Sequence, residues 1–205
     1  MNNAENVHIA LQYCKECGHT ELGYLGSTTG AENFNERHIA FLRYVKELNF
    51  QFDSKNEFRV KPTMLGAHDD FQNTGSEPGA SLLFFAENDT IALGAMKALK
   101  EKGYKIPNDV SLIGFDDIPY SSISSPTLTT IHVQRKIMGK QSVIQLMQLS
   151  RGSPVHAHED PDYGKAGGTL QRETSGIIRQ KSPGLSNLRD REIVSAARYL
   201  LRFFL

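Results

Sequence analysis

The segment 81–133 constrains the fold of this chain more than any other part of its sequence. It holds two apolar runs, 81–86 and 110–115, and an amphipathic helix pattern lies between them. Shortly after each run come acidic and amide side chains, Asn88 with Asp89 and Asp116 with Asp117. Apolar runs of this length are typical of strands buried on both faces, and strand–helix–strand alternation indicates a parallel sheet. The sequence therefore predicts an α/β fold.

Hydrophobic periodicity and turn residues predict the other elements. Asp89 is expected to cap a helix that Gly103 ends, and Asp117 to order its own loop, so both are interpreted as structural. Further helices are expected at 7–17, 33–48, 135–149 and 192–205. Further strands are expected at 22–25, 58–65, 127–133 and 169–174. Residues 66–80 and 150–168 are expected to be loops, the first with at most a short helix.

The balance of charge excludes a direct role in nucleic-acid binding. Lys and Arg total 23 and so do Asp and Glu, so no overall basic field attracts nucleic acid or an anionic membrane. Any DNA-reading part is therefore expected outside this chain. The N-terminus shows no basic region followed by an apolar one, and no run of about 18 apolar residues occurs. We expect a cytoplasmic protein with no membrane contact.

The motifs of common enzymes and cofactor sites do not occur in this sequence. Gly-x-Ser-x-Gly, His-Glu-x-x-His and Walker sequences are missing, and the glycines at 26 and 30 lack the spacing of a dinucleotide fingerprint. Cys14 and Cys17 lie near His19, but structural zinc needs four ligands and no second pair has suitable spacing. We therefore expect a binding protein without metal or cofactor rather than an enzyme.

Polar side chains near the ends of the predicted strands are the candidates for ligand binding, because open parallel sheets bind ligands beyond the carboxyl ends of their strands. The Asn88 amide can donate to one hydroxyl and accept from another, and the Asp116 carboxylate can accept from two. The Arg37 guanidinium suits a hydroxyl pair or an anion. Ser27 and its neighbour Thr28 can reach a ligand from the loop after the first strand. The alternatives are a cap or turn at Asn88 and a loop-ordering turn at Asp116. For Arg37 the alternative is an ordinary surface position, and for Ser27 a plain turn.

Several motifs of this chain also resemble one known family. The central stretch reads FFAENDTIALGAMKALKEKG, then IPNDVSLIGFDDI, then SPTLTTI, with Met138-Gly139 following. Before it, GHTELGYLGS precedes the segment Arg37-His-Ile-Ala-Phe41, and GGTLQRETS follows it at 167–175. Together these stretches resemble the effector-binding core of the lactose-repressor (LacI/GalR) family of bacterial transcription regulators. The resemblance spans about residues 7–175 and is most specific between Phe84 and Thr130.

The resemblance implies a fold and a way of working. The fold has two subdomains, each a Rossmann-like parallel sheet with flanking helices, around a cleft like that of periplasmic sugar-binding proteins. An effector closes the cleft, and closure changes the operator affinity of an N-terminal helix-turn-helix domain in a homodimer. The positions that match Arg37, Asn88 and Asp116 contact the effector in this family. The family commonly places Gln where this chain has Val133.

The resemblance also implies that the chain holds one subdomain nearly whole. Residues 7–133 and 167–175 are expected to form this effector-binding subdomain, and 134–152 a helix that belongs to the other. Residues 176–205 have no counterpart in the family pattern and are expected to be an atypical C-terminal extension. Neither the helix-turn-helix nor the strands that open the first subdomain can be placed before Val7.

The sequence therefore predicts the sensing part of a transcription regulator, with a small molecule, a sugar, as its effector. Operator DNA would be bound only through the domain that lies outside this chain. One alternative is a solute-binding protein that serves a sugar transporter, for which the sheet would be the same. Another is a degenerate fragment that binds no ligand.

Overall fold

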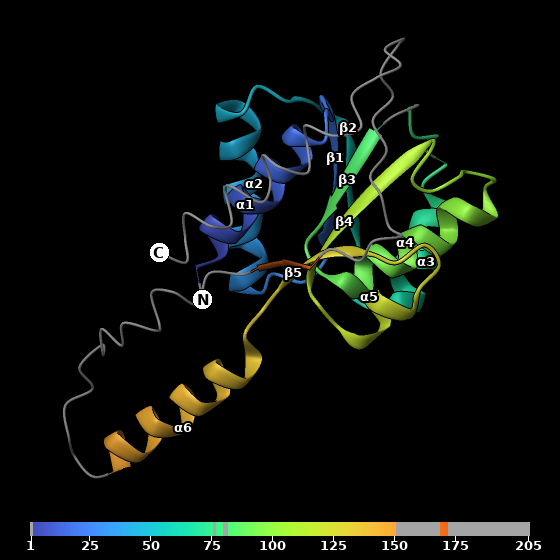
Figure 1. Ribbon diagram of the computed structural model, residues 1–205. Coiled ribbons are helices and arrows are strands. Elements are labelled where there is room, and N and C mark those ends of the chain that lie inside the picture. The colour runs from blue at the N-terminus through green and yellow to red at the C-terminus, as the bar shows by residue number, and fades with distance from the viewer. Residues whose placement is uncertain (1, 76, 80–81, 151–168, 172–205) are drawn as a thin grey trace, which may run out of the picture.

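The computed structural model describes residues 2–75, 77–79, 82–150 and 169–171, in which helices cover both faces of one sheet (Figure 1). The helices are α1 (Asn3–Glu16), α2 (Glu32–Glu47), α3 (Met64–Asn73), α4 (Asp89–Glu101), α5 (Pro119–Ile123) and α6 (Arg135–Ser150). The strands are β1 (Glu21–Ser27), β2 (Gln51–Val60), β3 (Leu82–Ala86), β4 (Val110–Asp116), β5 (Thr129–His132) and β6 (Thr169–Gln171).

The strands of the sheet lie in the order β2-β1-β3-β4-β5-β6. Neighbours from β2 to β5 pair in parallel, and β6 pairs antiparallel with β5. Because parallel neighbours need a crossover between them, helices connect successive parallel strands and pack on the faces of the sheet. The predicted α/β fold with a parallel sheet is confirmed.

Side chains of the central strand β3 alternate between two apolar cores. Leu83 and Phe85 belong to the core beneath α1 and α2, whereas Leu82 and Phe84 belong to the core beneath α3 and α4. This alternation follows from the two-residue period of a strand. All five residues of β3 are buried, which explains why its sequence is a continuous apolar run.

The structure corrects several expected element bounds. Where a loop with at most a short helix was expected at 66–80, α3 forms ten helical residues that begin at Met64. Thr63 caps this helix by accepting from the Gly66 amide, and Ala67 and Phe71 are buried on its inner side. β2 covers Gln51–Val60 instead of 58–65, and the short helix α5 was not expected.

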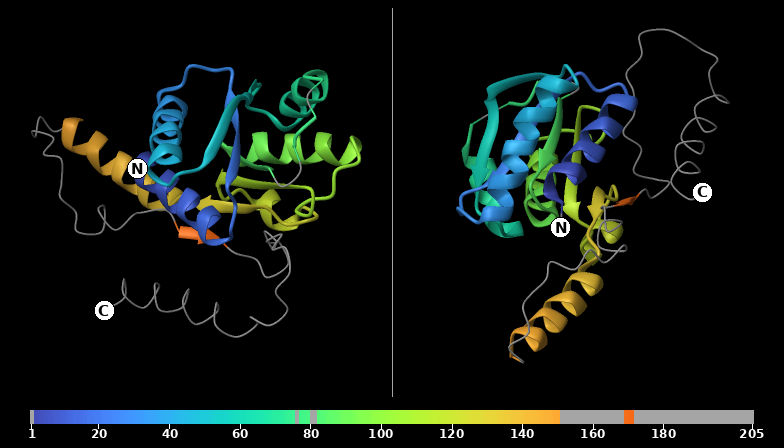
Figure 2. Two further views of the ribbon diagram at one scale, coloured as in Figure 1. Left: turned by 90° about the horizontal axis from the view of Figure 1, so that it is seen from above. Right: turned by 90° about the vertical axis from the view of Figure 1, so that its left-hand side faces the viewer.

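Helix α6 projects away from the sheet and its covering helices (Figure 2). The chain enters α6 directly after β5, and β6 then returns as the last strand of the sheet. The assignment of 134–152 to another subdomain stays a prediction. The expected loop 150–168, the helix 192–205 and the extension 176–205 lie wholly or almost wholly outside the described residues.

Candidate functional site

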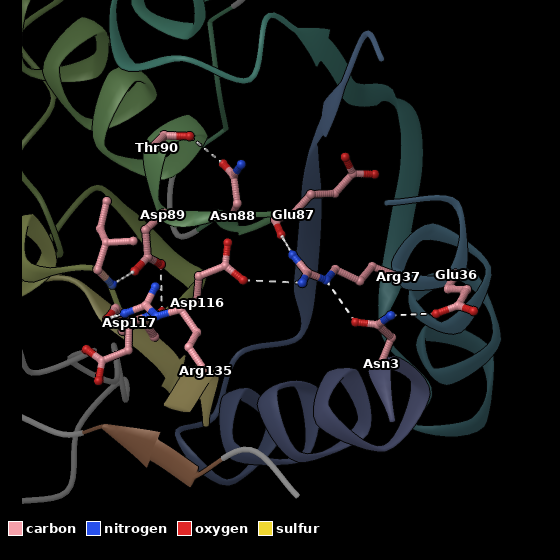
Figure 3. Close-up of polar contacts among 12 residues, drawn as sticks. Asn3, Glu36, Arg37, Glu87, Asn88, Asp89, Thr90, Asp116, Asp117 and Arg135 are labelled. Atoms are coloured by element: carbon pink, nitrogen blue, oxygen red, sulfur yellow. Dashed lines mark hydrogen bonds and ion pairs between the residues drawn. The ribbon is translucent and has the colours of Figure 1, made fainter. Parts of the chain in front are cut away.

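The parallel strands end along one edge of the sheet, and polar side chains gather there (Figure 3). Ser27 is the last residue of β1, Asn88 follows β3, and Asp116 ends β4. Helix α2 brings Arg37 to the same edge, where it contacts Asp116. We call these residues, Ser27, Arg37, Asn88 and Asp116, the strand-end site. Arg37 and Asp116 contact each other directly, whereas Ser27 is linked to Arg37 only through Glu87.

Arg37 lies at the centre of the strand-end site and is only 2% exposed. Its Nε donates to Asn3 Oδ1 at 3.1 Å, its Nη2 lies 3.2 Å from Asp116 Oδ1, and its Nη1 donates to the backbone carbonyl of Glu87. The guanidinium also lies 3.7 Å from the centre of the Phe115 ring. Burial lowers the pKa of Arg37 and the Asp116 carboxylate opposes that shift. The alternative of an ordinary surface arginine is wrong.

Asp116 presents a partly exposed carboxylate in a left-handed backbone conformation, with φ of 109°. One carboxylate oxygen accepts from Arg37, and the other accepts no hydrogen bond from any described residue. Burial raises the pKa of this carboxyl group, while Arg37 and Arg135 lower it. The free oxygen can therefore accept from a ligand hydroxyl.

Asn88 is the N-cap of α4. Its Oδ1 accepts from the Ile91 amide and from the Thr90 hydroxyl, both at 2.9 Å. Asp89, expected at this cap, is instead the first residue of the helix, so that expectation is wrong. The cap uses the amide oxygen of Asn88 alone, and its Nδ2 donates to no residue in the described part of the chain. Capping and ligand binding are therefore compatible at Asn88.

Ser27 is nearly buried at the end of β1. Its hydroxyl lies 2.7 Å from that of Thr29, and it accepts from the Thr29 amide at 3.0 Å. Its backbone amide donates to the Glu87 carboxylate. This geometry agrees with the alternative of a plain turn, and the binding role of Ser27 stays a prediction.

Asp89 is buried and joins α4 to the loop after β4. Its carboxylate accepts from the Ile118 amide at 3.0 Å and from the Ser121 and Thr130 hydroxyls, each at 2.6 Å. Burial raises the pKa of Asp89 to about 6, and these donors moderate the shift. Gly114 allows this approach, because a Cβ there would lie 2.2 Å from Asp89 Oδ1. The contacts fit the structural role expected for Asp89.

Asp117 holds the loop between β4 and α5. Its Oδ2 lies 2.6 Å from His132 Nδ1, and its carbonyl accepts from Arg135 Nη2 at 2.8 Å. Its backbone is left-handed, with φ of 51°. These contacts fit the expected loop-ordering role.

Sequence reasoning missed two residues that support the strand-end site. Glu87 is fully buried, and its carboxylate accepts from the Tyr24 hydroxyl and the Ser27 amide. Asn3, at the start of α1, accepts from Arg37 and donates to Glu36. The sequence could have indicated Glu87, because it is the first charged residue after an apolar run. No sequence pattern indicates Asn3.

Neither a metal cluster nor a membrane-spanning helix is found within the described residues. No group of at least three His, Cys, Asp or Glu side chains is placed to hold a metal ion there. Cys14 is buried in α1, Cys17 is partly buried, and the two do not form a disulfide with each other. No helix in the same part of the chain is long and apolar enough to cross a membrane.

Comparison with known proteins identifies the family. The pattern of the periplasmic binding protein-like domain matches residues 11–162. The chain belongs to this family. Over 155 residues it is 32% identical to the HTH-type transcriptional repressor PurR of Actinobacillus pleuropneumoniae, covering 72% of this chain and 44% of that repressor. Over 151 residues it is 32% identical to PurR of Vibrio campbellii, with the same coverage.

Solved structures of transcriptional repressors share the fold. The Escherichia coli transcriptional repressor ascG has a TM-score of 0.72 and 22% identity, covering 87% of this chain and 63% of that protein. The lac repressor dimer, bound to operator and the anti-inducer ONPF, has a TM-score of 0.67 and 25% identity, covering 76% and 54%. The resemblance to LacI/GalR regulators inferred from the sequence is thus confirmed. This family member spans 44% of the length of the PurR repressors cited.

Proposed function

We propose that this chain is the effector-sensing part of a bacterial transcription regulator, and that a sugar binds at the strand-end site. The observation that carries the proposal is the Arg37–Asp116 pair beside Asn88, at the carboxyl edge of a parallel sheet. The edge offers an unused Asp116 oxygen and an unused Asn88 amide group among the described residues. Adjacent acceptors and donors of this kind match vicinal hydroxyls. The relatives, which are transcriptional repressors, support a regulatory rather than catalytic role.

The proposed mechanism is closure of a cleft on the effector. The strand-end site forms one wall, and residues 134–152, which include α6, belong to the unit that carries the other wall. A ligand that contacts both walls only in the closed form favours that form by its difference in affinity for the two. The separation of α6 from the sheet is consistent with this division.

The proposed partners are a second copy of this protein and operator DNA. We expect operator DNA to be bound through a helix-turn-helix part outside this chain, and the regulator to lie in the cytoplasm with that DNA. Leu65 on α3 and Ile123 on α5 are large exposed apolar side chains on the helices that cover one face of the sheet. Exposed apolar groups of this kind suit a homodimer contact.

Thermal melts of the purified chain against pentoses, hexoses and disaccharides test the proposal. A sugar at about 100 times its dissociation constant adds about 2.7 kcal/mol and raises the melting temperature by a few degrees. The Asp116→Asn change should abolish the shift. Asn88→Ser should also weaken it, while a serine hydroxyl keeps the helix cap and hence the unliganded melting temperature.

A cooperative melt whose midpoint no sugar raises would contradict the proposal, because the chain would then fold without binding a sugar. A shift that survives both Asp116→Asn and Asn88→Ser would place the sugar elsewhere on the molecule.

A further inference from the structure

The carboxylate of Glu87 is buried beside the strand-end site without belonging to it. It is fully buried, and it collects donors from three directions. The Tyr24 hydroxyl and the Ser27 amide donate to it from β1, and Arg59 Nη1 of β2 lies 3.4 Å from its Oε1. Removing a carboxylate from water is costly and raises the pKa of Glu87, and these donors compensate for the lost hydration.

Glu87 accepts hydrogen bonds from the donors where β1 and β2 end, namely the Ser27 amide and Arg59. A free backbone amide at the end of β1 and a free arginine at the end of β2 would together suit an anion. Here the Ser27 amide is already bonded to Glu87. Arg59 is held between Glu57, at 2.8 Å, and Glu87, with its guanidinium 5.3 Å from the centre of the Tyr24 ring.

The other two arginines at this edge, Arg37 and Arg135, also already donate to acceptors of the protein. Arg37 donates to Asn3, to the Glu87 carbonyl and to Asp116. Arg135 donates to the carbonyl of Asp117. In the described part of the edge, every arginine therefore already has an acceptor. The carboxylates of Glu57, Glu87, Asp116 and Asp117 lie among the three arginines. A phosphate group at this edge would find no unpaired arginine among the described residues and would be repelled by the nearby carboxylates.

We propose that Glu87 sets the charge preference of the strand-end site, which therefore accepts an uncharged, hydroxyl-rich effector and rejects its phosphorylated form. The inference rests on the proposed function, because it concerns the ligand of the same site. An uncharged polyol needs only the free Asp116 oxygen and the Asn88 amide. A phosphate would need Arg59 and the Ser27 amide, which Glu87 holds.

Matched ligand pairs test the preference on the full chain. Glucose with glucose 6-phosphate, fructose with fructose 6-phosphate and ribose with ribose 5-phosphate are compared by thermal melts and ligand-detected NMR. In each pair that binds, the uncharged member should bind at least about tenfold more tightly. Tighter binding of the phosphorylated member overturns the inference and leaves a sugar-sensing role standing. Failure of every pair to bind, together with no shift by any pentose, hexose or disaccharide, overturns both.

Inorganic phosphate and two variants then test Glu87 itself. Glu87→Gln keeps the shape of the side chain and removes the charge that holds Arg59, so phosphate affinity should rise at least about tenfold. Glu47→Gln is the matched control, because Glu47 pairs with Arg43 at 2.7 Å on the exposed part of α2, about 15 Å further along the helix than Arg37. This control should leave phosphate affinity unchanged.

A gain of phosphate affinity in both variants would trace the effect to net charge and overturn the role of Glu87, as would no gain in Glu87→Gln. If Glu87→Gln does not fold, Arg59→Gln takes its place, because the proposal requires that Glu87 keeps Arg59 from binding phosphate. Phosphate affinity should stay unchanged in this variant, and a tenfold or larger fall would show that Arg59 binds phosphate beside Glu87 and would overturn the proposal.

Discussion

Arg37 connects three segments of the chain through a single side chain, so its removal should destabilise the fold. Arg37→Met keeps much of the volume but leaves Asp116, Asn3 and the Glu87 carbonyl without their donor. Breaking a buried pair typically costs 3–5 kcal/mol, and because the Asp116 carboxyl is 30% exposed we expect about 2 kcal/mol.

Urea unfolding followed by circular dichroism measures this cost. The matched control is Arg43→Met, which removes an exposed pair with Glu47 and should cost less than about 0.5 kcal/mol. Equal costs for the two variants would show that the Arg37 contacts contribute nothing beyond a surface pair.

Asp89 predicts a dependence of stability on pH. Its pKa in the fold is about 6, above the ordinary value of 3.8, so between these two values the folded chain binds a proton that the unfolded chain does not. Stability from this group therefore rises as pH falls from about 6 to about 4, by up to about 1.4 kcal/mol per pH unit.

The measurement compares urea midpoints of the parent chain and Asp89→Asn at pH 7 and pH 4.5. Asn cannot titrate, so the stability of the parent relative to the variant should increase at the lower pH. A difference between the two that is the same at both pH values would show that Asp89 ionises normally in the fold.

At the scale of single residues, the sequence predicts a side chain that ends a strand better than one that a distant segment holds. Asn88 and Asp116 were found because each follows an apolar run, and parallel strands end on one edge. The bond between the Glu87 carboxylate and the Ser27 amide joins residues 60 positions apart, and the bond between Arg37 and Asn3 spans 34. No local pattern encodes such a pair, because it exists only once the chain has folded.

Among the elements, the packing of α3 on α4 depends on a glycine. A Cβ at Gly94 would lie 2.4 Å from the Met64 carbonyl oxygen and 2.8 Å from the Ala67 Cβ. Because the nearest atom belongs to the backbone, Gly94→Ala must push the helices apart, and we expect a loss of about 2 kcal/mol.

Gly139 in α6 supplies the control, because a Cβ there meets no atom within 4 Å. Gly139→Ala should be neutral or should stabilise its helix by up to about 1 kcal/mol. Urea unfolding compares the two variants. A neutral Gly94→Ala would mean that α3 can shift on α4 without loss.

The same packing explains which elements could be predicted. β3 and β4 were found because strands that are buried on both faces need continuous apolar runs. α3 was expected to be mostly loop because its sequence is polar, and Ala67 and Phe71 are its only buried residues. Such a helix is fixed by its neighbour α4 rather than by its own periodicity, so the local sequence could not reveal its length.

For the molecule as a whole, the exposed apolar side chains of α6 predict self-association. Val143, Leu146 and Met147 are 56%, 65% and 49% exposed, and their spacing places them on one side of the helix. The helix projects from the rest of the described structure, so the fold itself does not cover this surface (Figure 2). Exposed apolar patches of this kind drive association.

Sedimentation velocity across a range of protein concentrations tests this prediction. The parent chain should form species larger than a dimer, and the double change Val143→Lys with Leu146→Lys should remove them. The matched double change Ser142→Lys with Gln145→Lys adds the same charge at polar positions of α6. It should leave the large species in place. If both double variants dissociate the large species equally, added charge rather than apolar contact explains the loss. Large species that persist in the apolar-site variant would place the associating surface outside α6, with the exposed residues of α3 and α5 as the next region to test.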